Sequence, residues 1–260
     1  MNKNIPILID LDGVIRLGNR LAGGALELFN FVNQNKIPSC IITNSTRNTS
    51  GEVIKFLNDN GINFKINAMT TVDATIEYIK EKKLRVSVYC IQSVQKEFEA
   101  YIDNRNPDAV IIGDLGEGWS YPILNDIFRK VYDGAEIIAM QKNKFWQPDG
   151  KSLALDAGAF VAAIEYATGK KSTLIGKPSP FYFQAALKIL GFKETNPFYM
   201  VGDDIENDIG GAQSIGGTGI LVYTGKTKFP LSSDMEVHPH FEVQNLFSVL
   251  EMLDGIFVKN

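Results

Sequence analysis

The sequence predicts an α/β protein built on a parallel sheet, with a second α/β domain inserted into the first. Short apolar runs alternate with segments of helical periodicity, which is typical of β-α-β units. The runs are continuously apolar, as expected of strands that a parallel sheet buries on both faces. The first series of units stops near residue 75 and resumes near residue 172, which indicates an insertion between two parts of one domain.

The first β-α-β unit lies at the start of the chain. An apolar run from Ile7 to Ile9 predicts a strand, and "GGALELFNFVNQNK" (23–36) has the spacing of an amphipathic helix. The run "CIIT" (40–43) then predicts a second strand. We expect both strands in the sheet of the first domain.

The same rhythm returns late in the chain. We expect strands in "STLIG" (172–176), "FYMVGDD" (198–204) and "TGILVYTG" (218–225), with helices through "PFYFQAALKILG" (180–191) and from about Ile205 to Ser214. Residues 1–74 and 172–260 are therefore predicted to form the core domain.

Residues 75–171 are predicted to form the inserted domain. Its expected strands are "RVSVYCI", "DAVIIGD" and "AEIIAM", and its expected helices lie around "QKEFEAYI", "YPILNDIFRKVY" and "LALDAGAFVAAIEYA". These segments hold enough apolar residues for a separate hydrophobic core.

Bulk composition excludes several classes of function. The 260 residues carry a net charge of −4 without a dense Lys/Arg cluster, which argues against a nucleic-acid partner. The N-terminal apolar run is too short for a signal or membrane segment, so we expect a cytoplasmic protein without a membrane partner. Cys40 and Cys90 each lie in an apolar run, which favours buried free thiols in a reducing compartment.

Polar side chains follow the predicted strands at the point where each strand ends. Ligands of open parallel sheets bind outside the carboxyl ends of the strands. We therefore expect Asp10, Thr43, Lys177 and Asp203 to meet at one edge of the sheet, although they lie far apart in the sequence.

Two acidic clusters would share this edge. Asp10 and Asp12 point to the same side of an extended chain, and Gly13 lets the backbone approach a ligand closely. The second cluster, "VGDDIENDIGG", contains Asp203, Asp204, Glu206 and Asp208. Like charges about 4 Å apart repel by roughly 4 kcal/mol at an effective dielectric near 20, so these carboxylates need a cation. Mg²⁺ suits oxygen ligands, and the chain lacks the His/Cys spacing of a zinc site.

Four motifs in this order carry a family resemblance that spans nearly the whole chain. "DLDGV", "TN", "GKPSP" and "GDDIENDIGGAQ" resemble the haloacid dehalogenase (HAD) superfamily of phosphohydrolases. The insertion between the second and third motifs is similar to the larger α/β cap, of C2 type, of its NagD-like branch. "VGDDIENDIGGAQ" followed by "GILVYTGK" is similar to the subgroup that contains phospholysine phosphohistidine inorganic pyrophosphate phosphatase. The resemblance implies a Rossmann-like core with such a cap.

The resemblance also implies roles for the residues of the first motif. Asp10 matches the nucleophile that attacks phosphorus and forms an aspartyl-phosphate. Asp12 matches the general acid/base, and its backbone carbonyl is expected to bind the metal.

The remaining motifs imply the phosphate and metal ligands. Thr43 and the N–H of Asn44, with Gly13, would hold the phosphate, and Lys177 would neutralise nucleophile and phosphate. Asp10 and Asp203 are expected metal ligands, and Asp208 is a metal ligand or supports one. Relatives vary at Asp204, so whether Asp204 or Asp208 contacts the metal directly stays open.

The resemblance predicts a Mg²⁺-dependent phosphatase that acts on a small phosphorylated metabolite. Hydrolysis of a phosphoramidate or of inorganic pyrophosphate is one alternative. A phosphate-binding protein that keeps the fold without turnover is another. The number of copies in the assembly stays open, including a homo-oligomer.

The inserted cap is expected to set substrate choice. Within "QKNKFWQPDGK" (141–151), Lys142, Lys144, Phe145 and Trp146 offer cationic and aromatic contacts, although a surface hairpin or an oligomer contact would have the same composition. Asp156 departs from the glycine-rich version of relatives and is a further candidate.

One other motif is set aside. "TGKT" (224–227) has part of the spacing of a nucleotide-binding P-loop, but Ile220 occupies the position of the first glycine.

Overall fold

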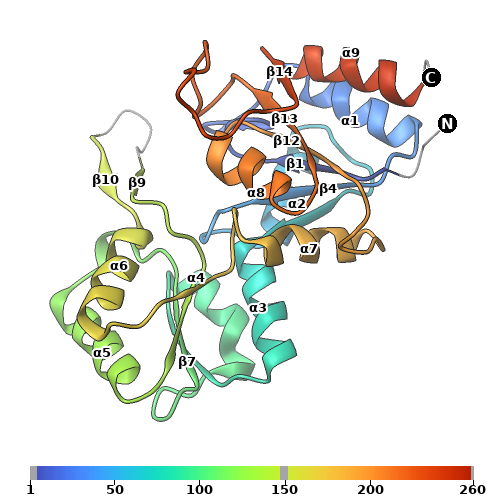
Figure 1. The fold of residues 1–260 in the computed structure, drawn as a ribbon. Helices are drawn as coiled ribbons and strands as arrows, with labels where there is room; N and C mark the ends of the chain where they lie inside the picture. Colours follow the sequence, from blue (N-terminus) through green and yellow to red (C-terminus); the bar gives the residue numbers. More distant parts are fainter. Residues whose placement is uncertain (1–4, 147–151, 259–260) are drawn as a thin grey trace. The chain divides into compact units, whose positions relative to one another are not determined.

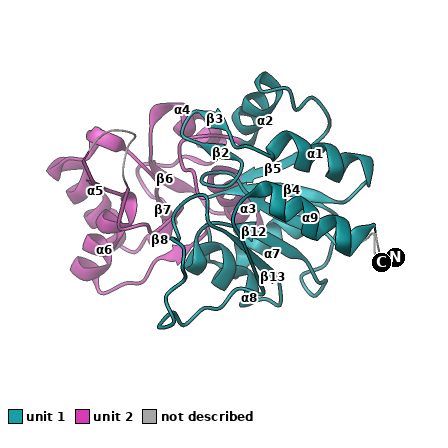
Figure 2. Cartoon of the chain, turned by 90° about the horizontal axis from the view of Figure 1, so that it is seen from above, with its two compact units in different colours: residues 1–43, 50–69, 177–260 teal, residues 44–49, 70–176 magenta. Residues whose placement is uncertain are grey.

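The structure, a computed structural model, describes residues 5–146 and 152–258 and divides into two compact units (Figure 2). Unit 1 falls within residues 1–43, 50–69 and 177–260, and unit 2 falls within residues 44–49 and 70–176. Each end of the inserted segment thus differs by five residues from the expected boundaries, 75 and 171.

Unit 1 contains a six-stranded sheet in the order β14-β13-β12-β1-β4-β5 (Figure 1). The strands assigned to unit 1 are β1 (Ile7–Asp10), β2 (Arg16–Leu17), β3 (Arg20–Leu21), β4 (Ser39–Thr43), β5 (Asn67–Thr70), β12 (Tyr199–Gly202), β13 (Thr218–Val222) and β14 (Phe241–Val243). The helical segments are α1 (Ala25–Gln34), α2 (Ser50–Asp59), α7 (Pro180–Ile189), η3 (Ile205–Gly210), α8 (Gly211–Gln213) and α9 (Leu246–Phe257).

Strand β1 occupies the middle of this sheet. It pairs in parallel with β12 on one side and with β4 on the other, and β12, β13 and β14 continue in parallel. The chain therefore changes direction across the sheet between β1 and β12. Such a switch point creates the crevice in which open α/β sheets bind ligands.

Alternation along the buried strands divides the unit 1 core between the two faces of the sheet. Ile7 and Ile9 belong to the cluster that includes Leu28 of α1 and Val249 of α9. Figure 1 shows α1 and α9 over one face, and α7 and α8 over the other. Because successive side chains of a strand point to opposite faces, both faces need an apolar cover, which explains the uninterrupted apolar runs.

Unit 2 is an α/β unit with its own sheet and core. Its four strands lie in the order β11-β8-β7-β6, and every pair is parallel. Its elements are α3 (Thr71–Lys82), β6 (Val86–Tyr89), α4 (Gln92–Gln95), η1 (Lys96–Tyr101), β7 (Ala109–Ile112), η2 (Gly116–Gly118), α5 (Tyr121–Tyr132), β8 (Glu136–Ala139), β9 (Phe145–Trp146), β10 (Ala154–Leu155), α6 (Ala157–Thr168) and β11 (Thr173–Leu174). Strands β9 and β10 form a separate antiparallel pair. Helices α5 and α6 pack their apolar faces against β7 and β8. The predicted α/β class with a parallel sheet is confirmed.

One expected strand belongs to the other sheet. "STLIG" was predicted as a strand of the core domain, and this placement is wrong, because Thr173 and Leu174 pair with Ile138 and Ala139 of β8 in unit 2. An apolar run carries no information about which strand will pair with it, since that choice depends on distant hydrogen-bond partners.

Three expected helices differ in extent or type. The segment after Asp204 is a π-helical stretch, η3, that continues into the short α8. The segment around "QKEFEAYI" begins in α4 and continues as the 3-10 helix η1. Helix α6 begins only after Asp156, because the preceding Ala154 and Leu155 pair with β9.

Cys40 and Cys90 are both buried, as predicted. Among the described residues, none of the helices is both long enough and apolar enough to cross a membrane.

Candidate active site at the carboxyl ends of β1 and β12

Two acidic segments meet where neighbouring strands of unit 1 end. Asp10 is the last residue of β1, and Asp203 directly follows the last residue of β12. The register pairs Ile9 with Val201, so Asp10 and Asp203 leave the sheet at the same edge. Parallel pairing of these strands thus brings together residues that are almost 200 positions apart in the chain.

Lys177 joins two carboxylates inside this site. Its Nζ donates to Asp10 Oδ1 at 2.5 Å and to Asp208 Oδ1 at 2.5 Å. All three side chains are at most 6% exposed. The residue lies just before α7, so it reaches the site from a loop of unit 1 and not from the expected core strand.

Asp208 is held by the chain around it. Its Oδ2 accepts hydrogen bonds from the backbone N–H groups of Asp203 and Asp204, at 3.2 and 3.1 Å. A Cβ at Gly202 would collide with this carboxylate, so the last residue of β12 must be glycine for Asp208 to lie over the strand end. The η3 segment therefore fixes Asp208 through backbone contacts as well as through Lys177.

Burial shifts the pKa values of the three carboxyl groups in this site, whereas ionic partners decide the shift of Lys177. Burial raises the pKa of Asp10 well above its ordinary range, although the Lys177 ammonium acts in the opposite direction. Burial and the nearby Asp208 carboxylate raise the pKa of Asp203 to about 6, and burial raises the pKa of Asp208. Burial alone would lower the pKa of Lys177, but Asp10 and Asp208 outweigh it and raise that pKa. The site thus holds three buried carboxylates and one buried ammonium, which bonds to Asp10 and Asp208.

The carboxylates of Asp10, Asp203 and Asp208 fit a hard divalent cation. Each offers a ligand oxygen, and these three oxygens all lie within 4.8 Å of one another. Two negative charges remain after Lys177 is counted, and a cation with oxygen ligands would compensate them. The Asp12 carboxylate does not belong to this group of three.

Asp12 differs from Asp10 in its surroundings. Its side chain is 50% exposed and forms an ion pair with Arg16 at 2.7 Å. Its Oδ2 also accepts a hydrogen bond from Thr43 Oγ1 at 3.1 Å. Thr43 ends β4 and is held in turn by the Tyr182 hydroxyl, which donates to the Thr43 carbonyl oxygen at 2.6 Å. Asp12 and Thr43 therefore lie in contact at the ends of β1 and β4.

Gly13 allows the loop after β1 to close over Asp203. Its φ of +94° lies in the left-handed region, and a Cβ there would collide with the Asp203 carboxylate. Asn44 directly follows Thr43 but belongs to unit 2, where a Cβ at Gly176 would meet its Oδ1. Unit 1 thus brings together seven of the predicted site residues: Asp10, Asp12, Gly13, Thr43, Lys177, Asp203 and Asp208.

The candidate specificity residues lie in unit 2, and two of them have local partners. Lys142 forms an ion pair with Glu165 of α6 at 2.9 Å. Asp156 is the N-cap of α6, since its Oδ1 accepts from the N–H of Ala157 at 2.7 Å and from Gln141 Nε2 at 2.5 Å. Burial raises the pKa of Asp156, and these hydrogen bonds act against that rise.

The rest of the candidate loop forms a short ribbon. Lys144 precedes β9 and accepts a hydrogen bond from Asp156 N–H on its carbonyl oxygen. Phe145 and Trp146 form β9 and are 59% and 42% exposed. Residues 147–151 of the same loop lie outside the described residues.

Four residues near the site were missed by the sequence analysis. They are Arg16, Tyr182, Thr224 and Lys226. Arg16 is four residues from Asp12, a spacing at which opposite charges often pair locally. Thr224 and Lys226 follow β13, so the strand-end rule that found Asp10 would also have found them. Tyr182 lies 139 positions from Thr43, and its helical surroundings carry no comparable signal.

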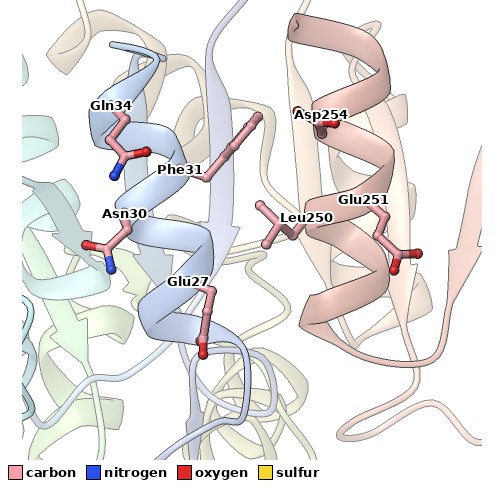
Figure 3. A pocket seen from close by; sticks show the side chains of 7 residues that line it. All are labelled: Glu27, Asn30, Phe31, Gln34, Leu250, Glu251 and Asp254. Carbon is pink, nitrogen blue, oxygen red and sulfur yellow. The ribbon is translucent and has the colours of Figure 1, made fainter. Parts of the chain in front are cut away.

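A groove of about 470 Å³ lies elsewhere in unit 1, between α1 and α9 (Figure 3). Its lining combines apolar and acidic side chains: Glu27, Asn30, Phe31, Gln34, Leu250, Glu251 and Asp254. None of these is a predicted site residue.

Comparison with known proteins identifies the family. The model described as haloacid dehalogenase-like hydrolase matches residues 7–104, and a second, HAD-hydrolase-like model matches residues 174–248. The chain is 34% identical over 224 residues to haloacid dehalogenase-like hydrolase domain-containing protein 2 from Bos taurus, covering 85% of this chain and 84% of that protein. It is 31% identical to phospholysine phosphohistidine inorganic pyrophosphate phosphatase from Mus musculus, covering 95% and 93%.

Solved structures agree with this relationship. A 4-nitrophenylphosphatase from Thermotoga maritima has a TM-score of 0.86 and 26% identity, over 96% of this chain and 97% of that one. NagD from E. coli K-12 shares the fold, with a TM-score of 0.84 and 23% identity, over 94% and 97%. The predicted resemblance is confirmed: this chain belongs to the haloacid dehalogenase-like hydrolase family and has the fold of its NagD-like members.

Proposed function

We propose that this protein is a Mg²⁺-dependent phosphatase that hydrolyses a small phosphorylated metabolite through an aspartyl-phosphate. The observation that carries the proposal is the buried Asp10, held by Lys177 beside Asp203 and Asp208, in a chain of a hydrolase family. A relative and a structural neighbour are named as phosphatases, which supports the same chemistry.

Asp10 would act as the nucleophile. Its carboxylate oxygen attacks phosphorus, and the bond between phosphorus and the leaving-group oxygen breaks. Nucleophilic attack requires the ionised carboxylate, whereas burial raises the pKa of Asp10. The Lys177 ammonium, 2.5 Å from Asp10 Oδ1, opposes that rise and would also attract the phosphoryl oxygens.

Asp12 would manage the proton in both halves of the reaction. Its carboxyl group protonates the leaving oxygen and then, as a carboxylate, takes a proton from the water that attacks the aspartyl-phosphate. The phosphorus–oxygen bond to Asp10 breaks, releasing phosphate and the free carboxylate. The half-exposed position of Asp12 suits exchange with substrate and solvent, and its contact with Thr43 orients it.

The remaining predicted groups would bind phosphate and cation. Thr43, the N–H of Asn44 and the Gly13 backbone are assigned to the phosphate oxygens. Asp10, Asp203 and Asp208, with the Asp12 carbonyl, would hold Mg²⁺. When bound, Mg²⁺ supplies positive charge that stabilises the phosphoryl oxygens and the ionised carboxylates.

Substrate choice is assigned to unit 2. Lys144, Phe145 and Trp146 remain candidates for contacts with the leaving group, whereas Lys142 and Asp156 also have structural partners. A phosphoramidate or inorganic pyrophosphate is the second candidate substrate class, favoured by the 31% identity to a phosphatase named for those compounds.

Phosphate release from a substrate panel tests the proposal. The panel contains p-nitrophenyl phosphate, sugar phosphates, phosphoramidates and inorganic pyrophosphate, each assayed with Mg²⁺ or with EDTA. The native chain is compared with Asp10→Asn, which keeps the shape of the side chain but removes the nucleophilic charge.

Release that requires Mg²⁺ and falls at least a thousandfold in Asp10→Asn would support the proposal, on the scale of losses seen when a nucleophile is removed. The order of substrates would then choose between the two substrate classes. Equal inactivity of both proteins across the panel, with Mg²⁺ still bound, would instead favour a phosphate-binding protein without turnover.

A further inference from the structure

The loop after β13 contacts the proposed metal site, although its "TGKT" motif is not a P-loop. The Lys226 N–H donates to Asp203 Oδ2 at 2.5 Å. The Thr227 N–H donates to the Asp203 carbonyl oxygen at 3.0 Å, and Thr227 Oγ1 accepts from Ile205 N–H at 3.1 Å. Residues 224–227 thus hold both the side chain and the backbone of the segment that carries Asp203.

The same loop is tied to the segment that follows the nucleophile. Thr224 Oγ1 donates to the Gly13 carbonyl oxygen at 2.5 Å. Lys226 Nζ also forms an ion pair with Asp204 at 2.5 Å. The loop therefore connects the ends of β1 and β12 through direct hydrogen bonds at both.

Two glycines enclose the Asp203 carboxylate. A Cβ at Gly13 or at Gly225 would collide with it, and a Cβ at Gly225 would also come within 2.9 Å of the Gly13 Cα. Neither position can carry a side chain without moving Asp203, so the carboxylate packs closely against both backbones. Its Oδ2 is then oriented by the Lys226 N–H.

We infer that the segment 224–227 is a positioning element for the metal site: it fixes Asp203 for Mg²⁺ and links that ligand to the nucleophile loop at Gly13. This inference rests on the proposed Mg²⁺ site and extends it to residues that hold no metal themselves. Groups that orient a metal ligand typically contribute 10- to 100-fold to metal affinity.

Direct Mg²⁺ binding tests the inference without reference to turnover. The measurement is calorimetric titration of the metal-free full chain with MgCl₂. Gly225→Ala is expected to weaken Mg²⁺ binding at least tenfold, because the new Cβ displaces the Asp203 carboxylate. The matched control is Gly255→Ala in α9, where a Cβ meets nothing within 4 Å.

Thr224→Val is the milder second variant and decides the question if Gly225→Ala does not fold. It removes the hydroxyl that bonds to Gly13 at nearly constant volume, and we expect a threefold or larger loss of Mg²⁺ affinity. The exposed Thr195→Val is its control. For both test variants, excess Mg²⁺ should restore most of kcat with p-nitrophenyl phosphate, whereas the half-saturating Mg²⁺ concentration rises.

The outcomes separate this inference from the proposed function. If the native chain binds Mg²⁺ and both variants bind it equally well, the positioning role is overturned. A melting temperature that falls equally with and without Mg²⁺, at unchanged Mg²⁺ affinity, would show a purely structural role and overturn it as well. Weaker binding in the variants of a chain that hydrolyses no substrate would support the inference while the phosphatase proposal fails. A native chain that binds no Mg²⁺ would overturn both.

Discussion

At the scale of single residues, Lys177 connects two buried carboxylates of the site. Its ammonium is buried between Asp10 and Asp208 and bonds to both. Removing one member of a buried ionic group leaves charges that neither water nor protein compensates. The residue thus serves folding and the proposed chemistry together.

Lys177→Met is expected to lower the free energy of unfolding by roughly 3 to 5 kcal/mol, measured by urea denaturation. Lys226→Met is the control, since that lysine also pairs with an aspartate but its side chain is 64% exposed. Because the lysine of this pair is exposed, although Asp204 is only 15% exposed, we expect a smaller loss, of about 1 kcal/mol. Equal losses in both variants would contradict a special role for the buried ammonium.

Replacing Lys177 is expected to destabilise the folded chain, whereas replacing Asp203 is expected to stabilise it when no metal is bound. The folded-state pKa of Asp203, about 6, lies above its ordinary value, so the folded chain binds this proton more tightly than the unfolded chain. This group therefore favours folding at low pH, and that contribution is lost as the pH rises through about 6.

Asp203→Asn is accordingly expected to stabilise the chain by about 1 to 3 kcal/mol at pH 7.5 in EDTA, on the scale of 1.36 kcal/mol per pKa unit. The difference should shrink as the pH falls through about 6 and disappear near pH 3, where the carboxyl group is neutral in both the folded and the unfolded chain. Added Mg²⁺ should stabilise the native chain but not the variant. A variant that is less stable than the native chain in EDTA at pH 7.5 would contradict this account.

At the scale of secondary-structure elements, Asp156 caps a helix. Its Oδ1 accepts a hydrogen bond from the N–H of Ala157, the first residue of α6. This helix lies in unit 2, as do the candidate specificity residues. A departure from the glycine-rich pattern of relatives therefore has a local structural explanation. Aspartate is among the residues that most favour this position.

Asp156→Ala is expected to cost about 1 kcal/mol of stability, whereas Asp156→Asn retains a capping oxygen and should cost less. Thermal unfolding of the full chain measures the difference. If the two variants are equally stable but differ in their order of preferred substrates, Asp156 acts in specificity and not as a cap.

The loop after β13 is a second element whose role depends on its contacts. Local composition made "TGKT" a candidate for nucleotide phosphates, and the missing glycine excluded that interpretation. The structure shows its N–H and hydroxyl groups directed at Asp203 and Gly13. Residue 225 is a glycine that packs against the Asp203 carboxylate, with which a Cβ would collide.

At the scale of the whole molecule, each unit has a core of its own. The buried cluster in unit 1 gathers residues from the central strands, α1 and α9, and the cluster in unit 2 gathers residues from β7, β8, α5 and α6. Cys40 lies buried in unit 1 and Cys90 in unit 2, so each thiol reports on one unit. Burial raises the pKa of Cys90 to about 12, which keeps that thiol protonated at pH 8.

Neither thiol is expected to react with iodoacetamide at pH 8 in the folded chain. The urea concentration at which Cys40 becomes reactive should rise when Mg²⁺ is present, because the three proposed carboxylate ligands lie in unit 1. A hundredfold excess of Mg²⁺ over its Kd corresponds to about 2.7 kcal/mol. The urea concentration at which Cys90 becomes reactive should be the same with and without Mg²⁺. Mass spectrometry of the labelled peptides measures both.

An equal shift for the two thiols would show that the units unfold together. Labelling of either thiol in the folded chain would contradict the burial itself.

Several features could be predicted from local sequence. Continuous apolar runs predicted the parallel strands, and the polar residue at the end of each run predicted Asp10, Thr43 and Asp203. The order of four motifs predicted the family. The sequence predicts these features because buried strands require apolar residues and the ligand-binding ends of the strands carry polar ones.

Tertiary structure alone decided the rest. The run at 172–176 joins β8 of unit 2, since strand pairing is selected by distant hydrogen-bond partners. Tyr182 reaches the site across 139 positions, and no local pattern records such a contact. The sequence by itself determined the fold class, the family and the acidic residues of the site. Packing determined which carboxylates are buried, which of them bond to Lys177, and which loop contacts Asp203. These contacts join groups that become neighbours only when the chain folds.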